Sequence, residues 1–178
     1  MQQQQTVEAA PVLKTIRVKV SAEDAFRVFT EGIDSWWPRT HHIGSVPMKK
    51  VIVEGRVGGR CYSEQTDGTE CPWGSVLAWD PPRRFVMAWQ ISTAWKFEPD
   101  LAKSSEVEVR FIPEGEGATL VELEHRYLER HGVDFEKMKA SVASDGGWGG
   151  LLALFAAQAE GRSSGGAGAG ESAQEAGR

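Results

Sequence analysis

The 178-residue sequence is poor in cysteine, has no long apolar run and carries no excess of positive charge. Two cysteines are too few for a disulfide framework, so we expect a reducing compartment, the cytoplasm. No apolar run approaches the roughly 18–20 residues that span a bilayer, and residues 1–6 lack the basic start and apolar stretch of a signal peptide. The formal net charge of -5 argues against a nucleic-acid partner, which usually requires a basic surface.

The sequence also lacks the short motifs of several enzyme classes. We find no nucleophile elbow, P-loop, dinucleotide-binding fingerprint or zincin motif. Structural zinc sites prefer closely spaced pairs of ligands, whereas Cys61 and Cys71 are ten positions apart and His41 and His42 are adjacent. We therefore expect neither a metal ion nor a cofactor.

Tryptophan, in contrast, is abundant, with seven residues in the chain. Large rigid rings favour a domain that encloses a molecule or packs a thick core. With 40% hydrophobic and 25% charged residues, the composition is that of one ordinary soluble domain. We place this domain at residues 12–160, between a flexible N-terminal arm (residues 1–11) and a disordered tail rich in glycine, serine and alanine (residues 161–178).

Alternating apolar and polar side chains predict about seven β-strands. The turn signal at residues 67–68 and the other short connections make the strand pairing antiparallel. In the last strand one face carries Val121, Leu123, His125 and Tyr127, and acidic residues lie on the other. The predicted strands are residues 14–20, 49–55, 59–65, 69–79, 84–92, 105–111 and 118–127.

Short helices are predicted on both sides of this run of strands. Ser21 is a candidate N-cap for a helix that follows the first strand. Residues 31–37 form a second short helix, which Pro38 ends. Residues 134–144 form a modest helix after the last strand.

The stretch of residues 147–159 is predicted to be a long apolar helix that covers the sheet. Asp145 precedes it as a candidate N-cap. Gly147, Gly149 and Gly150 each cost about 0.5–1 kcal/mol relative to alanine in a helix, so we expect a neighbouring loop or strand to lie close to its first turn. The apolar stripe comprises Trp148, Leu151, Leu152, Phe155, Ala156 and Ala159.

Six sequence blocks follow one another in a characteristic order: residues 20–26 (VSAEDAF), 57–60 (VGGR), 67–70 (DGTE), 73–89 (WGSVLAWDPPRRFVMAW), 117–125 (GATLVELEH) and 147–148 (GW). Together they resemble the SRPBCC (START-like) superfamily. Within it, the chain is similar to the bacterial form of the domain named for the activator of heat-shock-protein-90 ATPase. The resemblance covers roughly residues 12–160.

The resemblance implies an α+β helix-grip fold, in which a curved antiparallel sheet wraps around a long C-terminal helix. It also implies a cavity between sheet and helix that encloses a small apolar or aromatic molecule. Because folds of this kind host binders, carriers and a few enzymes, two alternatives stay open. One is a cyclase- or hydratase-like enzyme that uses the same cavity. The other is a stress-response or chaperone-associated interaction module, which would favour a homodimer.

Several tryptophans are candidates for the cavity wall, although they would equally well fill the core. Trp89 shares a strand face with Met87, and Trp148 begins the covering helix. Trp79 and Trp95 are further candidates. The predicted ligand-binding residues are Trp36, Trp37, Trp73, Met87, Trp89, Leu123, His125, Trp148 and Leu152.

His125 is the candidate for proton exchange near pH 7, because strand alternation places it on the inner face. If the protein is an enzyme, His125 is its predicted catalytic residue. The alternative is a structural histidine, hydrogen-bonded to the opposite strand. His41 and His42, with Arg39 and the preceding tryptophans, form either a lid over the cavity mouth or an ordinary loop.

Overall fold

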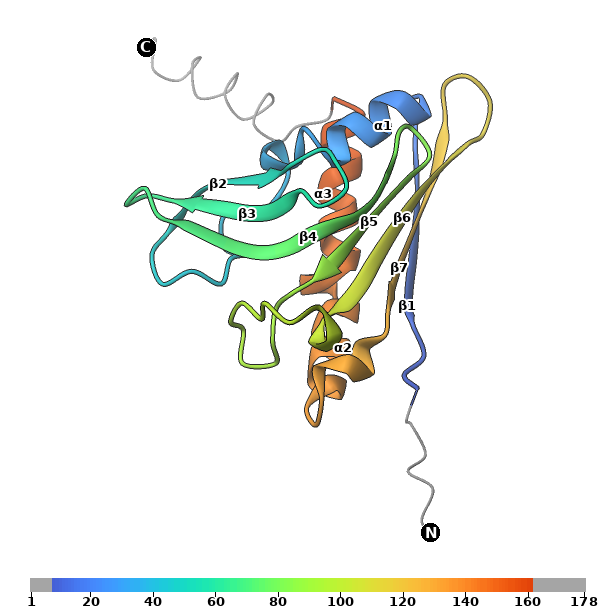
Figure 1. Ribbon diagram of the computed structural model, residues 1–178. Helices are drawn as coiled ribbons and strands as arrows, with labels where there is room; N and C mark the ends of the chain where they lie inside the picture. Colours follow the sequence, from blue (N-terminus) through green and yellow to red (C-terminus); the bar gives the residue numbers. More distant parts are fainter. Residues whose placement is uncertain (1–7, 162–178) are drawn as a thin grey trace, which may run out of the picture.

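The computed structural model describes residues 8–161, and at its centre is a curled antiparallel sheet (Figure 1). Its seven strands lie in the order β1-β7-β6-β5-β4-β3-β2, so that β1 joins the sheet beside the last strand. The strands are β1 (Val12–Val18), β2 (Met48–Val53), β3 (Arg60–Gln65), β4 (Glu70–Asp80), β5 (Arg84–Trp89), β6 (Ser105–Pro113) and β7 (Thr119–Arg126). The predicted helix-grip fold is confirmed, with strand ends that differ from the prediction by a few residues. The outer parts of the predicted arm and tail, residues 1–7 and 162–178, lie outside the described residues.

Alternation in β6 and β7 separates the two faces of the sheet. Val109 lies opposite Leu123, and both are buried on the inner face. Next to them, Arg110 lies opposite Glu122, and their side chains form an ion pair at 3.2 Å on the outer face. The period-2 pattern therefore turns one apolar face toward the helices and one charged face toward solvent.

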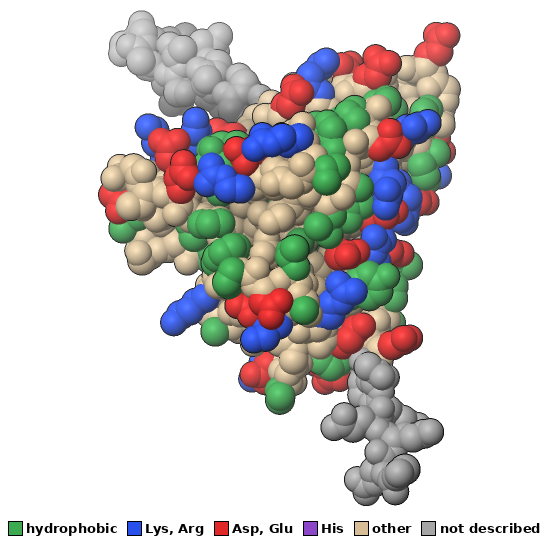
Figure 2. All heavy atoms as spheres, in the orientation of Figure 1, with side chains coloured by type: hydrophobic (Ala, Val, Ile, Leu, Met, Phe, Trp, Pro, Cys, Tyr) green, Lys and Arg blue, Asp and Glu red, His purple; other side chains and the backbone are tan. Residues whose placement is uncertain are grey.

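A network of ion pairs centred on Glu108 covers the outer face of β5, β6 and β7. Burial opposes ionisation of Glu108, but hydrogen bonds from Arg110, Arg84 and Arg126 outweigh it and lower the pKa of its carboxyl to about 2. Figure 2 shows acidic and basic side chains interspersed over this region of the surface. These mixed charges keep the outer face of the sheet, which no helix of residues 8–161 covers (Figure 1), in contact with solvent.

Two short helical segments follow β1 and close one end of the sheet. Ser21 caps α1 (Ala22–Phe29), since its hydroxyl oxygen accepts from a backbone N–H of the first turn at 3.2 Å. The helix predicted at residues 31–37 is shorter in the structure, a single 3-10 turn, η1 (Ile33–Ser35). Trp36 ties this turn to α1, because its indole N–H donates to an α1 carbonyl at 2.9 Å.

The opposite end of the sheet carries η2 (Leu101–Lys103), η3 (Leu128–His131) and α2 (Phe135–Ala143) (Figure 1). Tyr127, predicted to share the inner face of the last strand, instead lies outside β7. It has a left-handed φ of 60° and is 40% exposed, because the chain turns there into η3. Among the described residues, no helix has the length and apolar character to cross a membrane.

The helix predicted for residues 147–159 is broken near its start. One π-helical turn, η4 (Asp145–Gly149), precedes α3 (Gly150–Ala159). Ser144, rather than the predicted Asp145, occupies the N-cap position, and it makes no side-chain cap hydrogen bond. The predicted stripe is nevertheless turned inward: Trp148, Leu151, Leu152, Phe155 and Ala156 are buried, and Ala159 is partly buried.

Two of the three glycines are required by the turn and by the end of α2, rather than by a neighbouring loop or strand. Gly147 has non-helical angles, φ -98° and ψ -134°. A Cβ there would lie 2.3 Å from the carbonyl oxygen of Val142, and a Cβ on Gly150 would lie 2.2 Å from that of Asp145. A Cβ on Gly149 would meet nothing closer than 3.7 Å.

This difference predicts opposite effects for two neighbouring substitutions. Gly147→Ala should lower the free energy of unfolding by about 1–3 kcal/mol, because its Cβ overlaps backbone atoms that cannot move aside. Gly149→Ala should leave stability unchanged or raise it by up to about 1 kcal/mol, because Gly149 has helical angles and its Cβ would meet neighbours only at ordinary contact distances. Urea unfolding of both variants measures the two effects, and equal losses would contradict the assignment.

Candidate functional site

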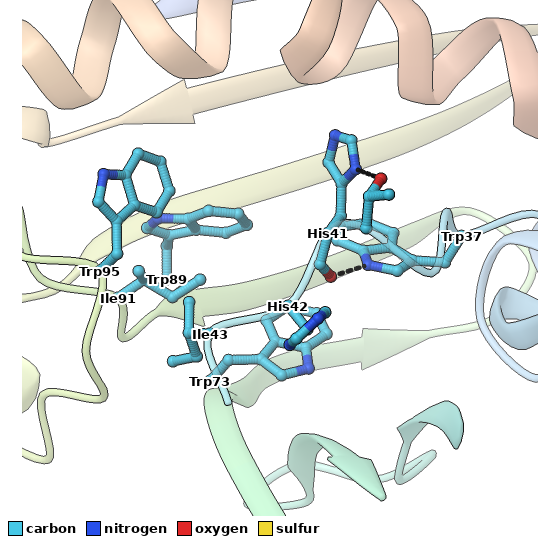
Figure 3. A pocket seen from close by; sticks show the side chains of 9 residues that line it. Trp37, His41, His42, Ile43, Trp73, Trp89, Ile91 and Trp95 are labelled. Atoms are coloured by element: carbon cyan, nitrogen blue, oxygen red, sulfur yellow. Dashed lines mark hydrogen bonds between the residues drawn. The ribbon is translucent and has the colours of Figure 1, made fainter. Parts of the chain in front are cut away.

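A pocket of about 220 Å³ opens beside the C-terminal helix (Figure 3). Three segments form its wall: the loop after η1, the strands β4 and β5, and the loop that follows β5. None of its lining residues belongs to α3 or η4. They are Trp37, Thr40, His41, His42, Ile43, Trp73, Trp89, Ile91 and Trp95.

Indole rings form most of the wall, and they contact one another. Trp37 and Trp73 are stacked, with ring centroids 5.6 Å apart and an interplanar angle of 16°. Trp73 meets Trp89 edge-on at 6.0 Å. Gly74 allows these strands to approach, since a Cβ there would lie 2.6 Å from the carbonyl oxygen of Ala88. The result is a rigid aromatic surface contributed by elements far apart in the sequence.

The loop side of the pocket is fixed by hydrogen bonds of His41. Its backbone carbonyl accepts from the indole N–H of Trp37 at 2.8 Å. Its Nε2 lies 2.7 Å from the carbonyl oxygen of Gly146, which can only accept, so Nε2 carries the proton. In the neutral ring Nδ1 then accepts from the hydroxyl of Thr40 at 3.1 Å. The loop is thereby fastened to the turn that begins the C-terminal helix.

Trp95 stands at the outer edge of the pocket in an unusual backbone conformation. Its φ is 59°, a left-handed value that costs a residue with a Cβ roughly 1–2 kcal/mol. The tight turn around it is closed by hydrogen bonds from its own N–H to Ser92 O and from Ser92 N–H to Lys96 O, both 2.8 Å. The indole is 46% exposed although it lines the pocket. Strain of this kind gathers at functional sites.

His125 lies behind this wall, in a buried chain of hydrogen bonds. The indole N–H of Trp148 donates to His125 Nδ1 at 3.0 Å. Because an indole nitrogen only donates, the neutral ring of His125 carries its proton on Nε2, which donates to Ser105 Oγ at 2.7 Å. The hydroxyl of Ser105 in turn donates to His131 Nε2 at 2.7 Å. Trp89 contacts the ring of His125 edge-on at 5.4 Å and separates it from the pocket.

The pocket brings together three of the predicted ligand-binding residues, Trp37, Trp73 and Trp89. The other six are buried in the core around it: Trp36, Met87, Leu123, His125, Trp148 and Leu152. They do not reach the pocket because aromatic rings, such as Phe29 and Phe155 at 5.1 Å from each other, fill the space beneath α3. Ile91, which the predicted strand at residues 84–92 places on the same face as Trp89, also lines the pocket, just beyond the end of β5. The pattern of the sequence did not point to Ile43, which lies in a loop.

The buried histidines make stability depend on pH. Burial, together with the nearby His131, lowers the pKa of His125 to about 3, and burial also lowers the pKa of His131. In the unfolded chain a histidine takes up its proton near pH 6.5. Below that pH the unfolded state binds more protons than the folded state, so acid favours unfolding.

We therefore expect the free energy of unfolding to fall between pH 6.5 and 5, by up to about 1.4 kcal/mol per pH unit from His125, with a smaller contribution from the partly buried His131. Carboxyl groups of the unfolded chain take up their protons mainly below this window, near pH 4. Urea unfolding at successive pH values measures the slope. His125→Gln, which removes one titrating group, should flatten it, and an unchanged slope would show that His125 is not the source.

Three kinds of comparison place the chain among known proteins. A solved structure described as an anthrahydroquino-gamma-pyrone synthase, Txn09, complexed with SUM, is 40% identical, with 84% of this chain and 96% of that chain covered and a TM-score of 0.60. The self-sacrificing resistance protein CalC from Micromonospora echinospora is 28% identical, with coverage of 86% and 96% and a TM-score of 0.65. The Aha1 dimer from Colwellia psychrerythraea, 15% identical with coverage of 85% and 97%, has a TM-score of 0.58 and shares the fold.

A search of curated protein sequences found no match. The family model described as Activator of Hsp90 ATPase homolog 1-like protein matches residues 19–160, which include every strand from β2 to β7 and all of α3. The chain belongs to this family.

Proposed function

We propose that this protein binds a planar aromatic small molecule in the tryptophan-lined pocket. The observation that carries the proposal is the convergence of four indoles, Trp37, Trp73, Trp89 and Trp95, from three segments around one hollow. Flat rings favour offset or edge-on contact with other aromatic rings, worth about 0.5–1.5 kcal/mol per pair beyond area burial. A planar ligand can contact several of these indoles at once.

The size of the hollow limits what it encloses. At about 220 Å³ it is below the roughly 300–1,000 Å³ of sites that bury most of a drug-sized molecule. One or two fused rings fill it, and the rest of a larger ligand lies in the mouth beside Trp95. This arrangement accounts for an exposed indole held at the edge.

The similarity to the pyrone synthase supports an aromatic ligand and favours a second candidate, a ring-closing enzyme. That protein, 40% identical, is named for a product with an anthrahydroquinone and a gamma-pyrone. Within the pocket of this chain, His42 is the imidazole with a nitrogen, Nδ1, that has no hydrogen-bond partner. An enzyme would use His42 for proton transfer, and His125, with both ring nitrogens engaged, would position the wall behind it.

To test for enzymatic activity, the protein is incubated with an anthrahydroquinone substrate, and ring closure is monitored by chromatography and absorbance. If His42 transfers a proton, the turnover rate should fall at least 10-fold in His42→Asn, a larger loss than the loss of ligand affinity. Tight binding of the substrate without turnover would contradict the enzyme hypothesis and support the binding function.

We also propose that the protein is cytoplasmic and forms a homodimer. A homodimer and a cytoplasmic location rest on the sequence, and the Aha1 dimer, at 15% identity, supports the fold alone. A stress-response or chaperone-associated role rests on the family resemblance alone.

A matched pair of substitutions tests ligand binding at the pocket. Trp95 and Tyr127 are both exposed aromatic residues with left-handed φ values, but Tyr127 does not line the pocket. Trp95→Gly should weaken binding of naphthalene-sized aromatics about 10-fold, the loss of roughly one ring contact. Tyr127→Gly should leave affinity unchanged. Isothermal titration calorimetry measures both.

Glycine relieves the backbone strain in both variants, so each should keep its stability to within about 1 kcal/mol. Loss of affinity in both variants, or in neither, would place the ligand elsewhere. The absence of binding by the wild-type protein across a panel of planar aromatics would refute the proposed function.

A further inference from the structure

The indole nitrogen of Trp89 is a buried hydrogen-bond donor without a partner. Trp89 is 6% exposed, and its Nε1 contacts no acceptor. Three other buried tryptophans do donate: Trp36 to Val28 O at 2.9 Å, Trp37 to His41 O at 2.8 Å, and Trp148 to His125 Nδ1 at 3.0 Å. A buried donor left unsatisfied costs about 1–3 kcal/mol. The fold therefore supplies an acceptor to each of these three indoles and leaves the N–H of Trp89 without one.

Packing prevents Trp89 from turning to find a partner within the protein. Its ring meets Trp73 at 6.0 Å, Trp148 at 5.7 Å and His125 at 5.4 Å, all edge-on. These neighbours come from β4, η4 and β7. Because the core around Trp89 is close-packed, the direction of its N–H is fixed before any ligand arrives.

A second unpartnered nitrogen belongs to the same pocket. His42 Nδ1 is buried and has no hydrogen-bond partner. It comes from the loop, whereas Trp89 comes from the sheet, and Figure 3 shows the two side chains at different places around the hollow. Of three such buried side-chain nitrogens in residues 8–161, two therefore belong to residues that line this one pocket.

We infer that the pocket selects aromatic ketones: a carbonyl oxygen on the ligand's ring system accepts from Trp89 Nε1–H, and His42 contacts a further polar atom of the ligand. This inference rests on the proposed binding function and specifies its ligand class. An indole N–H can only donate, so the matching group must be an acceptor. A hydrocarbon of the same shape would bury the donor again without satisfying it.

Access to Trp89 Nε1 requires a neighbouring side chain to move, since this nitrogen is closed to solvent. Trp95 is suited to that movement. It lines the same pocket, is 46% exposed and is held in a strained backbone conformation, and Figure 3 shows its ring on the same side of the hollow as that of Trp89. Displacement of the Trp95 side chain would uncover the N–H of Trp89. The indole of Trp95 would then contact the bound ring.

The test compares 1-indanone with indane, two bicyclic molecules that differ in one carbonyl group. Calorimetric titrations give the ratio of their affinities for the wild-type protein, for Trp89→Phe and for the control Trp79→Phe. Trp89→Phe keeps an aromatic ring and loses the N–H, so we expect the preference for 1-indanone to fall about 10-fold while indane affinity changes less than about 2-fold. Trp79 does not line the pocket, and its variant should keep the wild-type ratio.

An additional measurement uses the wild-type protein, in case Trp89→Phe packs poorly. In ¹⁵N NMR spectra, 1-indanone should shift the indole N–H resonance of Trp89 downfield, and indane should not. An unchanged ratio in Trp89→Phe, together with equal shifts from both compounds, would overturn the carbonyl contact while leaving aromatic binding intact. If neither compound nor any larger planar aromatic binds, the proposed function fails, and this inference fails with it.

Discussion

The hydrogen bond from Trp148 to His125 joins parts of the chain that are far apart in the sequence. It links η4 to β7, and through Ser105 it continues into β6 and η3. Because the indole can only donate, this bond sets the tautomer of His125 and the direction of every hydrogen bond that follows. The same indole contacts the rings of Trp37 and Trp89. The position of the pocket wall therefore depends on a contact deep in the core.

The fold was predictable from the sequence wherever one face of a strand or helix is buried and the other is exposed to solvent. In β7 the alternation of Val121, Leu123 and His125 with acidic residues identified both the strand and its inner face. The turn at η4 was not predictable in this way. Its shape depends on close contacts between the backbone at Gly147 and carbonyl groups at the end of α2, and side-chain periodicity carries no record of such contacts.

The candidate site was predictable only in part, for a related reason. Tryptophan content indicated aromatic walls, and Trp37, Trp73 and Trp89 do line one pocket. The sequence pattern could not show that aromatic rings packed against α3 fill the space between the helix and the sheet. The pocket therefore lies beside the helix and not beneath it. The pattern also placed His125 on the correct face and left open a hydrogen bond to the opposite strand, which Ser105 of β6 provides, but it did not reveal the second partner, Trp148 of η4. Loop residues such as Ile43 have no periodic pattern that would indicate their position.

The hydrogen bond between His41 and the carbonyl of Gly146 has a thermodynamic consequence. It fastens the loop that forms one wall of the pocket to the first turn of the C-terminal helix, more than a hundred residues away in the sequence. Coupling of this kind acts in both directions. A molecule that orders the loop also resists fraying of the helix, and a change that loosens the helix start weakens retention of the molecule. Occupancy of the pocket and protection of the α3 amides from hydrogen exchange therefore rise and fall together.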